Sequence, residues 1–235
     1  GVLYRDRIGD LREAEASFEQ AFALDATCTI AAAGLGRIAF EKRNHRAAIE
    51  HLEPVLARLD ELRTEEAAEV CTSAAESFAE LGQPERSLDA LKRARDLMPA
   101  SLPHNERYAA ALMRAGMARE AERLYAAIYD RFEERIDTSE KVRLLLARAD
   151  AQIGAEHARD AVATVRRGLE LRPEDPELLA ALTRCHEATH DWNEVVNLLQ
   201  LRARRAADAE QRFDLLVKTG DVFLEKLKDR DAAAQ

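Results

Sequence analysis

The chain has 235 residues, of which 47% are apolar and 34% charged, a composition typical of a folded protein rather than a disordered one. Its net charge of -9 argues against nucleic-acid binding, which needs a concentrated basic face. No apolar run approaches the roughly 20 residues of a membrane span, and no signal peptide is visible. Aromatic residues are scarce and alanine is abundant, which suits closely packed helices.

Paired amphipathic helices are predicted along the whole chain, because apolar residues recur at helical spacing between turn residues. The helix–turn–helix units that we expect, in chain order, are 1–28, 29–67, 68–101, 102–139, 140–175, 176–212 and 213–235. The first and the last unit are partial. Because both ends break a unit and the first residue is Gly1, we expect a fragment of a longer array.

The unit at residues 68–101 shows the pattern most clearly. Two short helices flank a turn at Gly82-Gln83-Pro84, and Pro99 closes the second helix. Small residues stand where the helices must touch, at Ala75, Ser87 and Ala94, and larger ones fall between them, at Phe78, Leu88, Leu91 and Leu97. This arrangement resembles the tetratricopeptide repeat (TPR), a helix–turn–helix unit of about 34 residues.

The resemblance covers essentially the whole chain, since the same positions recur in register in the other units. Leu35-Gly36 matches the Leu-Gly pair of the family, although its usual tryptophan near the start of each repeat is absent. The resemblance implies an all-α, right-handed superhelical solenoid of about six to seven TPR-like repeats, forming a single domain over residues 1–235. HEAT-like repeats are the alternative, but they are usually longer and lack these small-residue positions.

The spacing of the units alternates. The small residues that open each second helix are Ala14, Ala48, Ser87, Ala121, Ala161, Val195 and Ala233, so the gaps are 34, 39, 34, 40, 34 and 38 residues. The longer gaps follow units without a closing proline, where residues 58–65, 131–139 and 202–210 read as polar, helix-favouring sequence. We therefore predict alternating shorter and longer units, the second helix being longer by about one turn in every other unit. Extra loop residues are the alternative.

One stretch, His186-Glu187-Ala188-Thr189-His190, is a literal H-E-x-x-H, in which a helix presents two imidazoles to zinc beside a glutamate base. A zinc hydrolase is therefore a minor alternative. The repeat register argues against it, because it places His186 at a packed position and His190 at the turn, where the helix ends. We expect two structural histidines and no metal site.

Other signatures of enzymes are absent from the sequence, which has no glycine-rich phosphate loop, no G-x-S-x-G and no C-x-x-C. We therefore expect no catalytic residue, no cofactor and no enzymatic activity. The cysteines Cys28, Cys71 and Cys185 lie far apart inside helical patterns, so we expect reduced, buried thiols.

The surface with functional character is the concave groove, which the first helices line in TPR proteins. Transferring the register of the family gives the candidate partner-binding residues Arg37, Phe40, Glu76, Met113, Arg114, Arg148, Gln152, Arg184, Glu187 and Asp221. Arg114, Arg148 and Arg184 would form a basic strip, and because guanidinium groups grip carboxylates, an acidic segment is a candidate partner. Ordinary solvated arginines paired with glutamates are the alternative.

The resemblance implies a non-catalytic scaffold that binds a peptide or helix of a partner protein in this groove. A regulatory segment of a larger multidomain enzyme or signalling protein is the alternative, and RNA-binding helical hairpins are disfavoured by the acidity of the chain. We expect protein partners, no nucleic acid and no membrane span. Cytoplasm is the expected compartment, because the chain carries cysteines and no visible signal.

Overall fold

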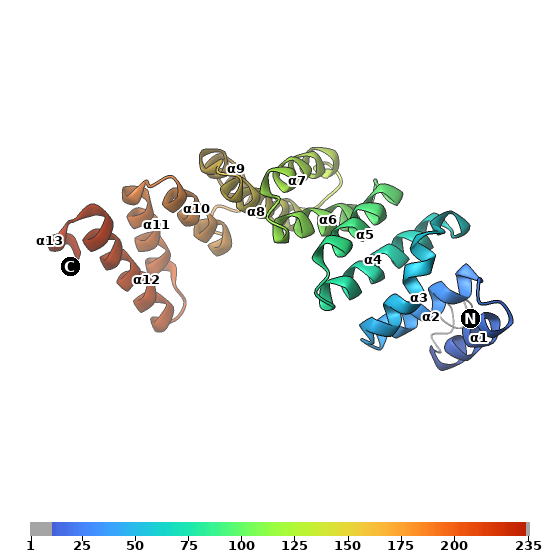
Figure 1. The fold of residues 1–235 in the computed structure, drawn as a ribbon. Helices are drawn as coiled ribbons and strands as arrows, with labels where there is room; N and C mark the ends of the chain where they lie inside the picture. The colour runs from blue at the N-terminus through green and yellow to red at the C-terminus, as the bar shows by residue number, and fades with distance from the viewer. Residues whose placement is uncertain (1–10, 234–235) are drawn as a thin grey trace. The chain divides into compact units, whose positions relative to one another are not determined.

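A computed structural model describes residues 11–233, in which every regular element is helical (Figure 1). The α-helices are α1 (Leu11–Leu24), α2 (Thr29–Glu41), α3 (His45–Leu56), α4 (Thr64–Glu80), α5 (Pro84–Leu97), α6 (Leu102–Arg114), α7 (Ala118–Phe132), α8 (Thr138–Gly154), α9 (Ala158–Leu171), α10 (Pro176–Ala188), α11 (Trp192–Arg205), α12 (Ala209–Val222) and α13 (Arg230–Ala233). A 3-10 turn at Leu59–Glu61 and a π-helical turn at Phe223–Leu227 complete the described elements. Within these residues, no helix combines the length and the apolar composition needed to span a membrane.

The chain divides into two compact units, residues 1–115 and 116–235. The boundary falls at the turn between α6 and α7, inside the expected repeat 102–139, so the single domain over residues 1–235 stays a prediction. Each unit has its own core. Leu52 and Phe78 are buried in the first, and Val165 and Leu178 in the second.

The turn has one geometry in the five helix pairs from α2–α3 to α10–α11. Three residues separate the first helix from the second, and the middle one has a positive φ: Arg43, Gly82, Gly116, Glu156 and His190. In the turns at Arg43, Gly82, Glu156 and His190, the next residue donates its backbone N–H to a carbonyl five positions earlier, as in a Schellman motif. The small residue that opens the second helix follows the positive-φ residue by five positions every time, as Ser87 follows Gly82.

These small residues are buried. Ala48, Ala161 and Val195, in the second helices α3, α9 and α11, are fully buried, as are Ala14 and Ala121, and Ser87 is nearly so. The helices α2 and α3 approach closely at Gly36, where an added Cβ would lie 2.5 Å from the Leu52 side chain. The predicted small positions are therefore packing positions.

The predicted longer second helices are wrong. The second helices α3, α5, α7, α9 and α11 have 12, 14, 15, 14 and 14 residues, so they do not alternate. The lengths of the first helices do alternate: α2, α4, α6, α8 and α10 have 13, 17, 13, 17 and 13 residues. The extra turn therefore lies at the start of every other first helix.

Helix caps explain this placement. Asp137, in an extended conformation before α8, accepts the backbone N–H of Glu140, whose side chain accepts the N–H of Asp137. This capping box fixes the start of α8 at Thr138, after α7 has ended at Phe132. In the first unit, Arg58 adopts a non-helical conformation (φ -136°, ψ 39°) after α3, and α4 begins at Thr64 with Glu65 and Glu66 in its first turn.

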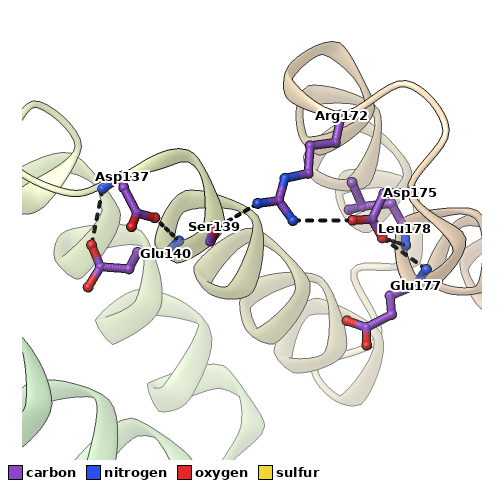
Figure 2. A network of polar contacts seen from close by, with 7 residues as sticks. All are labelled: Asp137, Ser139, Glu140, Arg172, Asp175, Glu177 and Leu178. Carbon is purple, nitrogen blue, oxygen red and sulfur yellow. Dashed lines mark hydrogen bonds and ion pairs between the residues drawn. The ribbon is translucent and has the colours of Figure 1, made fainter.

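Polar side chains link the starts of consecutive first helices in the second unit (Figure 2). Arg172, just after α9, donates to the Ser139 hydroxyl in the first turn of α8 and lies 3.6 Å from the Asp175 carboxylate. Asp175 in turn caps α10 by accepting the N–H groups of Glu177 and Leu178. One arginine thus joins the N-terminal ends of α8 and α10.

Candidate functional site

A pocket in the first unit gathers side chains from the C-terminal ends of three first helices, α2, α4 and α6. Its volume is about 300 Å³. It is lined by Phe40, Glu41, Arg43, His45, Glu76, Ala79, Glu80, Ser87, Leu91 and Arg114. Three of the candidate groove residues, Phe40, Glu76 and Arg114, therefore meet in one cavity although they are up to 74 positions apart in the sequence.

The apolar part of the pocket is held by the core beneath it. Phe40 is half-buried and packs against the cluster that contains Leu52 and Phe78. Its ring meets the His45 ring edge-on, with 6.0 Å between the centroids. His45 Nδ1 lies 3.3 Å from the Ser77 hydroxyl. These contacts fix the aromatic ring before any partner arrives.

The charged part of the pocket is exposed to solvent and unpaired. Glu41, Glu76, Glu80, Arg43 and Arg114 are all exposed, and among the described residues none of these side chains has a hydrogen bond or ion pair. The carboxylates thus outnumber the guanidinium groups around this cavity, and all of them are free to meet a ligand.

The other two candidates of the first unit do not line this pocket. Arg37 on α2 forms an ion pair with Glu69 on α4, and its side chain is only 17% exposed. Met113 is half-buried near the end of α6. The ion pair uses Arg37 to join two neighbouring first helices.

In the second unit, the structure corrects the candidate set. Gln152 is 3% exposed and accepts a hydrogen bond from the Thr164 hydroxyl at 2.7 Å, so it belongs to the core between α8 and α9.

The charged candidates of this unit differ in their surroundings. Arg184 on α10 donates to Asp150 on α8 at 2.8 Å. Arg148 is half-buried, and its Nε is buried without a partner among the described groups. Glu187 and Asp221 are exposed.

The expected basic strip is therefore not supported. Arg184 is neutralised by Asp150 on the preceding first helix, and Arg148 is largely withdrawn from solvent. The pairs Arg37–Glu69 and Arg184–Asp150 run between neighbouring repeats, at sequence separations of 32 and 34 residues. Sequence inspection gave the register of these arginines but not their partners.

The H-E-x-x-H stretch does not present two imidazoles on one helical face. His186 is 5% exposed within α10, and its Nδ1 lies 3.4 Å from Asp191. His190 lies beyond the end of α10, with a φ of 59°, and its ring centroid is 5.6 Å from that of Trp192. The helix ends between the two histidines, as the register predicted.

A different group of potential metal ligands escaped the sequence analysis. Glu122, His157 and Asp160 place their ligand atoms within 4.8 Å of one another, the one such group of three among residues 11–233. Nδ1 of His157 is 2.8 Å from Glu122, which links α7 to the start of α9. Asp160 lies in the first turn of α9, where a carboxylate stabilises the helix dipole. Structural roles thus account for each of these residues.

Two of the three cysteines, Cys71 and Cys185, are buried thiols with low reactivity. Burial raises the pKa of Cys71 to about 12 and that of Cys185 to about 11, so both stay thiols at neutral pH. Cys28 is half-buried, and all three are free.

No protein-family model and no curated protein sequence matches this chain. Solved structures do resemble it. The TPR-like repeats of a kinesin light chain from Podosopora anserina are 19% identical, with a TM-score of 0.59 over 82% of this chain and 97% of the other. YrrB, described as a TPR protein with an unusual peptide-binding site, is 19% identical, with a TM-score of 0.60 over 74% and 84%. A tetratricopeptide repeat protein from Parabacteroides merdae is 16% identical, with a TM-score of 0.58 over 98% and 85%.

Proposed function

We propose that this chain, which has the fold of tetratricopeptide-repeat proteins, is a non-catalytic scaffold that binds a segment of a partner protein at the pocket of α2, α4 and α6. The observation that carries the proposal is the meeting of Phe40, Glu76 and Arg114 in one cavity. These residues come from three successive first helices, the helices that the repeat register assigned to the groove.

The physical argument is preorganisation. The ring of Phe40 is held by the core and by His45 in the unliganded chain, so a partner that covers it gains apolar contact without ordering the scaffold. The charged rim is unpaired, so a partner need not break existing ion pairs to reach it. Aromatic anchors in pockets with a polar rim are typical hot spots of protein interfaces.

The likeness to YrrB supports the same reading at a coarser level, because that protein is described by a peptide-binding site. The fold itself suggests a scaffold rather than an enzyme, since the neighbours are repeat proteins.

Selection of peptides from a random displayed library tests the proposal. Enriched peptides would be measured by fluorescence anisotropy against the wild type, Phe40→Ala and Phe22→Ala. Phe22 is also half-buried, but it lines a different cavity of the same unit, so Phe22→Ala is the matched control. We expect Phe40→Ala to weaken binding about tenfold or more, as truncation of an aromatic hot spot does, and Phe22→Ala to have little effect. Equal binding by a folded Phe40→Ala variant would refute the pocket as the site.

A further inference from the structure

We infer that the pocket of α2, α4 and α6 receives a basic side chain, Lys or Arg, of the partner segment. This inference rests on the proposed function and gives the chemistry of its ligand. It is the opposite of the prediction from the sequence, in which the arginines indicated an acidic partner segment.

Charge at the pocket is the first argument. Three carboxylates line it, Glu41, Glu76 and Glu80, against the guanidinium groups of Arg43 and Arg114. His45 is the remaining titratable group, and it adds no charge when neutral. The excess is therefore negative, and a cation placed between the carboxylates would be favoured.

Helix ends reinforce this excess. Glu41 is the last residue of α2 and Glu80 the last of α4, and neither helix has a basic residue in its last turn. The C-terminus of a helix carries about half a negative charge, so acidic residues there are unfavourable and cations are favoured. The chain places carboxylates at two helix ends where they oppose stability, and a bound cation would relieve both.

The carboxylates of the pocket are not neutralised within the described part of the chain. Elsewhere in that part of the first unit, several acidic side chains form ion pairs, among them Glu15 with Lys42, Glu53 with Arg86, Glu66 with Arg63, Glu69 with Arg37, Asp89 with Arg93 and Asp96 with Arg95. Glu41, Glu76 and Glu80 have no such partner among the residues described. An arginine or lysine from outside the chain would pair with them without breaking an existing ion pair.

The aromatic ring suits the same ligand. Phe40 offers its ring to the apolar stem of a lysine or arginine and to its charged head, since cations are attracted to ring faces. The chain already uses this contact internally, with Arg86 lying 4.1 Å from the centroid of the Phe78 ring. Carboxylates beside an aromatic ring therefore point to a cationic side chain.

The test compares two charge reversals with equal effect on net charge. Glu76→Lys alters the pocket, and Glu50→Lys alters an exposed residue of α3 that does not line it. Peptides selected on the wild type are sequenced and measured against both variants at low and high salt. We expect enrichment of Lys or Arg, about tenfold weaker binding to Glu76→Lys, less than about twofold change for Glu50→Lys, and weaker binding at high salt.

Other outcomes separate this inference from the proposed function. Enriched Asp or Glu, with binding lost in Arg114→Glu and kept in Glu76→Lys, would overturn the basic ligand and leave the scaffold proposal standing. Peptides that bind equally to wild type, Phe40→Ala and Glu76→Lys would overturn both. Equal weakening by Glu76→Lys and Glu50→Lys would show attraction to the acidic chain as a whole, and that too would overturn the inference.

Discussion

Arg184 on α10 donates to Asp150 on α8 across a distance of 2.8 Å, and both side chains are 50% exposed. The pair joins the first helices of two neighbouring repeats. The positive charge that Arg184 would offer to an acidic partner is therefore balanced within the chain.

This pair should contribute little to stability, because exposed ion pairs are typically worth about 0 to 1 kcal/mol. We expect Arg184→Ala to lower the free energy of unfolding by less than about 1 kcal/mol, with the difference shrinking in high salt. Urea unfolding of Arg184→Ala, Asp150→Ala and the double variant gives the coupling energy. Arg166→Ala, at an exposed arginine of α9 that has no ion pair among the described residues, is the control. A coupling above about 2 kcal/mol would contradict the estimate.

Gly36→Ala should destabilise the first unit. Its Cβ would lie 2.5 Å from Leu52, which is fully buried and has no room to retreat, and 3.2 Å from the Ala48 carbonyl oxygen. We expect a loss of about 1 to 3 kcal/mol in urea unfolding, as for other overpacked cores. Gly220→Ala is the matched control, because the nearest atom to its Cβ would be 3.8 Å away. That variant should be neutral or gain up to about 1 kcal/mol from helix propensity, and equal losses at both positions would refute the packing argument.

Glu156→Gly should stabilise the second unit. Glu156 has a φ of 67° in the turn between α8 and α9, a conformation that costs a residue with a Cβ about 1 to 2 kcal/mol and glycine almost nothing. We expect a gain of about 1 kcal/mol in the free energy of unfolding, measured with urea. Glu156→Gln removes the charge and keeps the Cβ, so it should show no comparable gain. The argument fails if the two variants behave alike.

His104→Gln should reduce the loss in the free energy of unfolding that occurs as the pH falls. Burial lowers the pKa of His104 below its usual 6.5, and the nearby charge of Arg107 lowers this pKa further, against a smaller opposing effect of Glu69. Between this lowered pKa and 6.5 the unfolded chain binds more protons than the folded one, so stability is lost as the pH falls. Urea unfolding at pH 7.5 and 5.5 should show a smaller loss for His104→Gln than for the wild type. An equal or larger loss for His104→Gln would mean that folding does not lower the pKa of His104.

The helix pairs could be predicted from the sequence because their signals are local. Gly82 marks its turn correctly, Gly116 takes the same positive φ in another turn, and Ala48, Ser87 and Ala121 are buried as the small positions predict. No glycine stands in the turn between α8 and α9. Glu156, not Gly154, takes the positive φ, and Gly154 is the last residue of α8. A glutamate gives no hint of that conformation, whereas a nearby glycine gives a false one.

Features that depend on residues far apart in the chain could not be predicted from the sequence. Residues 58–65 have a composition that favours a helix, whether as a continuation of α3 or as an earlier start of α4. Their composition therefore could not show which of the two helices carries the extra turn. The register placed Phe40, Glu76 and Arg114 on the groove, and all three meet at one pocket. It could not reveal that Arg184 is paired with Asp150, because that pairing depends on a side chain 34 positions away.

The constancy of the three-residue turns has a consequence for the evolution of such a chain. The connections that lead from a second helix to the next first helix vary from three residues, 206–208, to seven, 57–63. These connections can accommodate insertions and deletions. A single residue added inside a turn such as 42–44 would instead move the second helix out of register with the first helix of its pair. Differences in length are therefore expected in the connections between hairpins, and not in the turns inside them.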